Sequence, residues 1–181
     1  DFMQVNATVN RQMVDTALDW LELSPQDNVL DLFCGIGNFS LSIARKVKQV
    51  FGLEGVPEMV QRAQNNAQQN GIDNVEFFCK DLEQKDALQK WAKLDINKVL
   101  LDPSRAGARQ LMAQIVELKP EKVLYVSCNP ATFGRDIAEL TSAQAGSKKG
   151  SLYSLEKIAL LDMFPYTAHT EIIASFVRRE K

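Results

Sequence analysis

The sequence is poor in residues that form cross-links or bind metals. It contains three cysteines (Cys34, Cys79 and Cys128) and one histidine. The odd number of cysteines and the absence of a CxxC spacing predict neither a disulfide framework nor a zinc site, so we expect no metal. Free thiols are typical of a reducing compartment, and the expected location is therefore the cytoplasm.

Long apolar runs and clusters of one charge are also missing. No apolar stretch approaches the roughly 20 residues that a membrane-spanning helix needs, which predicts no association with a membrane. The formal net charge is −2, and this modest acidic balance argues against a freestanding nucleic-acid binder. If the protein acts on RNA, much of the affinity is expected to come from elsewhere.

What the sequence does contain is an alternation of short β runs with helical periods. An apolar content of 45% and a charged content of 24% are ordinary for one globular domain, expected to span residues 1–181. A first helix is expected at 8–23. The expected strands are 28–33, 49–54, 75–80, 98–103 and 122–127. The helices expected to follow them are 39–47, 57–70, 82–93, 108–118 and 131–140.

Two further β-rich runs, 154–163 and 170–179, end the chain with only a loop between them, which predicts an antiparallel pair. Five strand–helix alternations followed by a hairpin indicate an α/β fold. We therefore expect a mostly parallel, doubly wound, Rossmann-like sheet with helices on both faces and an antiparallel hairpin at its C-terminal end.

Cys128 is the first candidate for catalysis, because it follows a buried strand and precedes Asn129-Pro130. Proline fixes its own φ and disfavours helical backbone at the residue before it, so the loop is expected to be stiff. In open α/β sheets ligands bind at this edge. Backbone N–H donors in the loop would help to stabilise a thiolate. The alternative is a small buried side chain, which is also what we expect of Cys34 and Cys79.

A glycine-containing loop joins the first expected strand to its helix. Gly35 and Gly37 allow backbone N–H groups to approach a ligand, although a GxG pattern alone is a weak signal. Glu54 ends the next strand about 20 residues later, where an acid accepts hydrogen bonds from ribose hydroxyls. Asp81, after the third strand, is placed to accept from an adenine amine. Each acid is alternatively a helix N-cap.

Together these strand ends predict a cofactor that contains adenosine. Both NAD and S-adenosylmethionine fit this geometry. NAD needs a pyrophosphate cradle, and Phe39 and Ser40 stand where a closely packed glycine would help to form one. S-adenosylmethionine carries no phosphate and tolerates these residues.

Five motifs resemble those of the RNA uracil-5-methyltransferases. They are FMQVN (2–6), DLFCGIGNFS (31–40), LDPSRAG (101–107), VSCNPAT (126–132) and LDMFPYTAHTE (161–171). The resemblance covers nearly the whole chain, and the DPxRAG and LDMFP forms are closest to the bacterial branch that modifies 23S ribosomal RNA. It implies an S-adenosylmethionine-dependent methyltransferase fold, with S-adenosyl-L-methionine as cofactor. The implied reaction is methyl transfer to C5 of a uridine through a covalent bond between a cysteine and C6.

The resemblance also implies roles for individual residues. Cys128 is the expected nucleophile, and Glu171 is the expected base that removes the C5 proton. The expected cofactor contacts are Gln4, Phe33, Asn38, Glu54, Asp81 and Asp102. The alternatives for Asp102 are that it orients the uracil or that it competes for the role of base. Arg105 and Arg109 either contact RNA phosphates or are solvated surface charges.

The N-terminal RNA-binding domain and the cysteine-rich iron–sulfur segment of this family have no counterpart in these residues. The resemblance therefore implies the C-terminal part of a longer protein, with an iron–sulfur cluster expected only in the part that is absent here. RNA, in particular 23S rRNA, is the expected partner, and the protein is expected to be a monomer.

Other functions stay open. Asp102-Pro103-Ser104 loosely resembles the (D/N)PP(Y/F) motif of methyltransferases that act on an exocyclic amine and need no nucleophile. Methylation of uracil in tRNA is a second alternative. A binding module without catalytic activity is the third, and it predicts no affinity for the cofactor.

Overall fold

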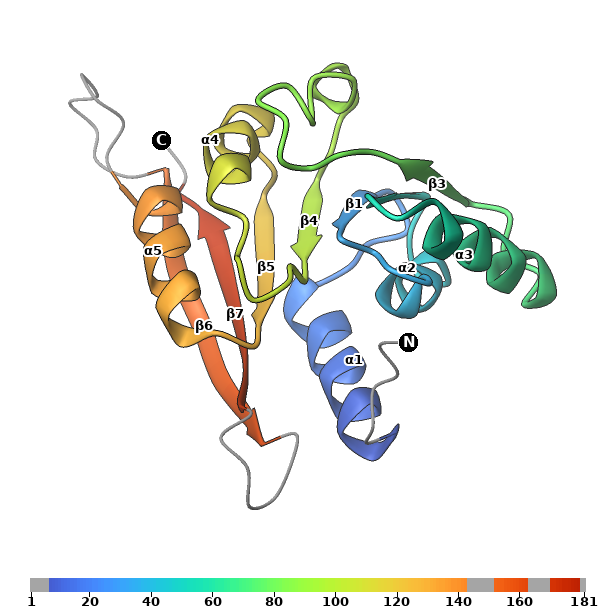
Figure 1. Ribbon diagram of the computed structural model, residues 1–181, viewed down its shortest axis with the longest axis horizontal. Helices are drawn as coiled ribbons and strands as arrows, with labels where there is room; N and C mark the ends of the chain where they lie inside the picture. Colours follow the sequence, from blue (N-terminus) through green and yellow to red (C-terminus); the bar gives the residue numbers. More distant parts are fainter. Residues whose placement is uncertain (1–6, 143–151, 163–169, 180–181) are drawn as a thin grey trace.

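The computed structural model describes residues 7–142, 152–162 and 170–179, and Gln4 lies outside these ranges. One sheet of seven strands runs through the domain in the order β3-β2-β1-β4-β5-β7-β6 (Figure 1). The strands are β1 (Asn28–Leu32), β2 (Gln49–Glu54), β3 (Val75–Cys79), β4 (Lys98–Leu101), β5 (Lys122–Ser127), β6 (Tyr153–Asp162) and β7 (Thr170–Arg178).

The pairing of the strands confirms the predicted architecture. Strands β1 to β5 are parallel to their neighbours, whereas β7 is antiparallel to both β5 and β6. Figure 1 shows β7 running between β5 and β6, so the last strand of the chain lies inside the sheet. The beginning of β7 is thereby placed beside the C-terminal end of β5.

Helices cover both faces of the sheet because the strands are apolar on both sides. They are α1 (Ala7–Leu21), α2 (Asn38–Ala44), α3 (Pro57–Gln69), α4 (Arg109–Leu118) and α5 (Pro130–Leu140). On one face, α1 and α2 pack against strand residues such as Leu100 and Val126. On the other, α4 and α5 pack against residues such as Leu101 and Val123. No helix in the described ranges is long and apolar enough to cross a membrane.

The helix expected at 82–93 is wrong. This connection consists of turns and one short 3₁₀ helix, η1 (Trp91–Lys93). The Leu88 N–H donates to Oε1 of Gln114 on α4 at 2.9 Å, and Nε2 of Gln114 donates to the Gln84 carbonyl at 3.1 Å. Backbone groups that an α-helix would pair internally are therefore bonded to a neighbouring helix. Periodicity alone did not reveal this tertiary contact.

Substitutions at two glycines, one in the sheet and one in α5, test how tightly the protein is packed around them. A Cβ at Gly52 of β2 would lie 2.5 Å from Cδ1 of Phe77 and 3.0 Å from Sγ of Cys34. We expect Gly52→Ala to lower the free energy of unfolding by about 1–3 kcal/mol, because the buried ring has to move. Gly134 of α5 has open space around a Cβ, so Gly134→Ala should add about 0.5–1 kcal/mol. Thermal unfolding followed by circular dichroism measures both, and an undiminished midpoint for Gly52→Ala would contradict this packing argument.

Candidate active site

Strand alternation places the main candidate residues on one face of the sheet. The cluster that contains α1 and α2 includes strand residues two positions before or after the candidates, namely Val29, Leu100, Val126 and Ile173. Side chains alternate along a strand, so a residue two positions away faces the same side. Two positions farther, at the C-terminal edge of the parallel strands, lie Asp31, Asp102, Cys128 and, from the antiparallel β7, Glu171.

Cys128 and Glu171 lie opposite each other at this edge. Strands β5 and β7 pair with Ser127 beside Ile172, and the next step of the same antiparallel register sets Cys128 against Glu171. Directly opposed residues on one face have Cβ atoms roughly 4.5–5.5 Å apart. Both side chains are half-buried. The structure thus brings together the two residues that the sequence analysis assigned to catalysis.

Arg105 completes this pair, although the sequence analysis gave it no role at the cysteine. Its guanidinium lies close enough to influence the pKa of the Cys128 thiol. Burial raises the pKa of the thiol, Glu171 raises it further, and Arg105 only partly opposes them. Burial also raises the pKa of Glu171, again against the influence of Arg105. The sequence feature that could have indicated this role is a cation three residues after Asp102, because a cation next to a cysteine stabilises the thiolate.

The backbone N–H groups expected to help the thiolate are engaged elsewhere. The Asn129 N–H donates to Oγ of Ser127 at 3.2 Å, and the Ala131 N–H donates to Oδ1 of Asn129 at 3.0 Å. Asn129 is thereby the N-cap of α5. The stabilising charge near Cys128 is therefore the guanidinium of Arg105. Arg109 is not part of the site, because it forms an ion pair with Glu139.

Two neighbouring carboxyl groups extend the site along the sheet edge. Burial, followed by the charges of Glu171 and Asp31, raises the pKa of Asp102 to about 8. Burial also raises the pKa of Asp31 to about 7, although Ser40 donates a hydrogen bond of 2.5 Å to its Oδ2. Its Oδ1 is buried without a partner among the described residues. The sequence analysis named Asp31 only as part of a motif. The feature that could have identified it as a site residue is its position as a charged residue inside an apolar strand.

The glycine loop is closed by internal hydrogen bonds. The Gly35 N–H donates to Oε2 of Glu54 at 3.1 Å, and the Gly37 N–H donates to the Cys34 carbonyl at 2.9 Å. Phe33, whose side chain is half-buried, has a φ of 62°, which is uncommon for a residue other than glycine and marks a tight turn. A pyrophosphate needs free N–H donors at this loop, so these bonds favour a cofactor without phosphate.

Two further residues predicted to contact the cofactor, Asn38 and Asp81, are hydrogen-bonded to neighbouring residues. Asn38, the first residue of α2, exchanges two side-chain hydrogen bonds with Asn10 of α1, at 3.2 and 2.9 Å. Asp81 is exposed, and its carboxylate accepts the Glu83 N–H at 2.9 Å and Nε2 of Gln84 at 3.3 Å. It stabilises a turn and not an α-helix, so the alternative of a helix cap does not apply. The cofactor contacts of both residues stay predictions.

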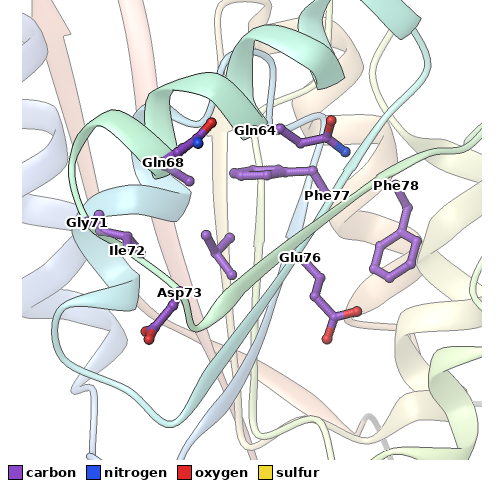
Figure 2. A pocket seen from close by; sticks show the side chains of 10 residues that line it. Gln64, Gln68, Gly71, Ile72, Asp73, Glu76, Phe77 and Phe78 are labelled. Atoms are coloured by element: carbon purple, nitrogen blue, oxygen red, sulfur yellow. The ribbon is translucent and has the colours of Figure 1, made fainter.

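Two other features lie apart from the site. Cys34 is buried as expected, but Cys79 is exposed because β3 is an edge strand, so its predicted packing role is wrong. A hollow of about 650 Å³ lies beside this strand. Figure 2 shows the side chains that line it, among them Phe77 of β3 and Gln64 and Gln68 of α3. None of the candidate residues lines this hollow.

The raised pKa of Asp102 predicts a pH-dependent contribution to stability. Between its ordinary pKa of 3.8 and its folded value of about 8, the folded state retains a proton that the unfolded state has lost. The carboxyl group therefore destabilises the fold progressively as the pH rises through this window. We expect the thermal unfolding midpoint of Asp102→Asn to rise relative to that of the wild type as the pH increases from about 5 to about 8.5. The exposed Asp86→Asn is the matched control, and a constant difference for Asp102→Asn across this range would refute the assignment.

Comparison with known proteins places the chain in a family. The profile described as tRNA (Uracil-5-)-methyltransferase matches residues 1–179. The 23S rRNA (uracil(1939)-C(5))-methyltransferase RlmD of Pasteurella multocida is 54% identical over 97% of this chain and 38% of its own length. The enzyme of the same name from Haemophilus influenzae strain Rd is 53% identical over 99% of this chain and 39% of its own. The chain thus spans about two fifths of the length of these relatives.

Solved structures agree with this assignment. The tRNA (uracil-54, C5)-methyltransferase of Pyrococcus abyssi, in complex with S-adenosyl-L-homocysteine, superimposes with a TM-score of 0.79 at 29% identity, over 98% of this chain and 40% of that one. The magnesium protoporphyrin IX methyltransferase of Synechocystis shares the fold, with a TM-score of 0.64 at 19% identity over 95% of this chain and 81% of that one. The chain therefore belongs to the tRNA (uracil-5-)-methyltransferase family, and its fold is that of the S-adenosylmethionine-dependent methyltransferases.

Proposed function

We propose that this chain is the catalytic domain of an enzyme that transfers a methyl group from S-adenosylmethionine to C5 of a uridine in 23S rRNA. The observation that carries the proposal is the pairing of β5 with β7, whose register, continued by one residue, brings Glu171 beside Cys128, with Arg105 close enough to lower the pKa of the thiol. Relatives above 50% identity that are named as 23S rRNA uracil-C5-methyltransferases support the choice of substrate.

The residues at the sheet edge fit a cationic cofactor without phosphate. Asp31 and Asp102 are carboxyl groups with raised pKa values, and Oδ1 of Asp31 is buried without a partner among the described residues. A sulfonium cation nearby favours the ionised form of such groups. Glu54, held by the N–H groups of Gly35 and Val56, is placed for ribose hydroxyls. When bound, S-adenosylmethionine supplies the methyl group that C5 of the uracil takes up.

Cys128 makes the uracil reactive. Its thiolate forms a bond to C6, and the electron pair of the C5–C6 double bond moves into an enolate, so that C5 becomes a nucleophile. Burial and Glu171 hold the pKa of the thiol above its ordinary value, and the positive charge of Arg105 partly offsets them. Arg105 therefore lessens the cost of forming the thiolate that this step needs.

Glu171 completes the reaction. After methylation, C5 still carries its proton, which the carboxylate of Glu171 removes. The electron pair of the broken C5–H bond restores the C5–C6 double bond, and the Cys128 thiolate is expelled from C6. Burial raises the pKa of Glu171 and makes it a stronger base than an exposed carboxylate, while Arg105 favours the ionised form that accepts a proton.

The alternatives account for less of this arrangement. A methyltransferase that acts on an exocyclic amine needs no nucleophile, which leaves the grouping of Arg105, Cys128 and Glu171 without a purpose. A binding module without activity needs neither a thiolate nor a base. A tRNA substrate is compatible with the site, but the Pyrococcus tRNA enzyme is 29% identical, whereas the Pasteurella rRNA enzyme is 54% identical.

Removal of the nucleophile should abolish the reaction. We expect Cys128→Ala protein to transfer no tritium from methyl-labelled S-adenosylmethionine to 23S rRNA, because the enolate is no longer formed. The matched control is Cys79→Ala, which removes an exposed thiol of β3 and should retain wild-type turnover. Substantial turnover by Cys128→Ala would favour the class that methylates exocyclic amines.

Removal of the base should trap the intermediate. In Glu171→Gln protein the thiolate still adds to C6 and C5 still becomes methylated, but the C5 proton stays in place. We expect a covalent complex of protein and RNA that survives denaturing electrophoresis, together with a loss of turnover of at least about 100-fold. Normal turnover without an adduct would assign the role of base to another group, with Asp102 the next candidate.

A further inference from the structure

Two separate loops have to meet for Arg105 to reach Cys128. Arg105 lies between β4 and α4, whereas Cys128 lies between β5 and α5. The carbonyl oxygen of Arg105 accepts hydrogen bonds from Nδ2 of Asn129 at 3.0 Å and from Oγ1 of Thr132 at 3.2 Å. Both donors belong to the loop and first turn that follow Cys128. The backbone beneath the guanidinium is therefore attached to the backbone beside the thiol.

Asp136 of α5 strengthens this attachment from inside the protein. Its side chain is fully buried, and Oδ2 accepts both the Ala108 N–H at 2.6 Å and the Tyr125 hydroxyl at 2.7 Å. Oδ1 accepts Nε of Arg135 at 2.8 Å, and Nη2 of Arg135 donates to the Ala106 carbonyl at 2.8 Å. One carboxylate thus joins β5, α5 and the end of the loop that carries Arg105.

The loop that carries Arg105 packs directly against α5 at Gly107. This residue has a φ of 79°, and a Cβ built there would lie 2.5 Å from Oδ2 of Asp136 and 2.7 Å from Nη2 of Arg135. A side chain at this position would push the loop away from α5. The close approach leaves Ala108 in place to donate its N–H to Asp136.

We propose that Asp136 is a positioning residue, which holds the Arg105 loop against α5 and so keeps Arg105 beside Cys128. This inference rests on the proposed function, because it assigns Asp136 a purpose only if Cys128 acts as a thiolate. A buried carboxylate suits the task, since it accepts several donors at once in a geometry that is costly to rearrange. Asp136 itself touches neither the thiol nor a substrate in this role.

The test measures the reactivity of the thiol and requires no RNA. The protein is treated with iodoacetamide over a range of pH, and the modification of each cysteine is followed by peptide mass spectrometry. Asp136→Asn keeps an oxygen for Ala108 and Tyr125 but turns an amide donor towards Arg135. We expect the pKa of Cys128 to rise by about one unit, so that its alkylation near neutral pH slows by about tenfold. Thr132→Val, which removes a donor to the Arg105 carbonyl, should act in the same direction.

The controls separate positioning from a general loss of stability. Glu139→Gln makes the same chemical change on the same helix, but Glu139 pairs with Arg109 of α4 and not with the Arg105 loop, so Cys128 should react as in the wild type. Cys79, exposed on β3, is the reference thiol within each sample. Unfolding midpoints of all variants show which of them remain folded at the temperature of the assay.

A double variant decides whether Asp136 acts through Arg105. If it does, Asp136→Asn should change the pH profile of Cys128 no further once Arg105→Ala is present, because the two substitutions remove the same contact. An equal additional effect in the Arg105→Ala background would overturn the proposal. The proposal would also be overturned if Asp136→Asn and Thr132→Val lowered the unfolding midpoint but left the pH profile of Cys128 alkylation unchanged. Failure of methyl transfer to RNA would count against the proposed function alone, since alkylation does not depend on it.

Discussion

The antiparallel pairing of β7 with β5 is the constraint on which the candidate site depends. Parallel strands deliver their C-terminal ends to one edge, which gathers Asp31, Asp102 and Cys128. A further parallel strand would bring only its last residues, and those that follow it, to this edge. Because β7 runs the other way, its first residues reach the same edge, and Glu171 arrives opposite the cysteine. An acid from the end of the chain thereby becomes the neighbour of a thiol from its middle.

Electrostatics explain why this edge needs cations. Burial raises the pKa values of Asp31, Asp102 and Glu171, and repulsion by Glu171 and Asp31 raises that of Asp102 further. Glu171 and Asp102 also make thiolate formation at Cys128 harder. Arg105 is the nearby charge that opposes this effect at both Cys128 and Glu171. A site of this kind is well matched to a cationic methyl donor, whose arrival would favour the ionised carboxylates. The acids and the arginine therefore act as one electrostatic unit.

Residues at strand ends were the part of the site that sequence could predict, because alternation of strands and helices fixes which edge they occupy. Cys128 was predicted in this way, whereas Glu171 was predicted from the resemblance of the motifs. Arg105 was not assigned, because its role depends on how two loops pack against each other. The helix expected at 82–93 failed for the same reason, since the side chain of Gln114 takes up the backbone of that segment. Contacts between elements lie outside what periodicity can show.

The register of β7 poses a final question, because this strand is apolar on both faces. A slip by one residue would turn Glu171 away from Cys128 yet still bury aliphatic side chains. Among the described residues, one polar contact distinguishes the registers: Oγ of the fully buried Ser175 donates to Oε2 of the surface residue Glu156 at 3.0 Å, and Glu156 pairs with the buried Lys122 of β5 at 3.0 Å. Bonds to Lys122 and Ser175 outweigh burial and lower the pKa of Glu156. A slipped strand would leave this ion pair without its hydroxyl donor, so the contact of Ser175 favours the register that sets Glu171 beside Cys128.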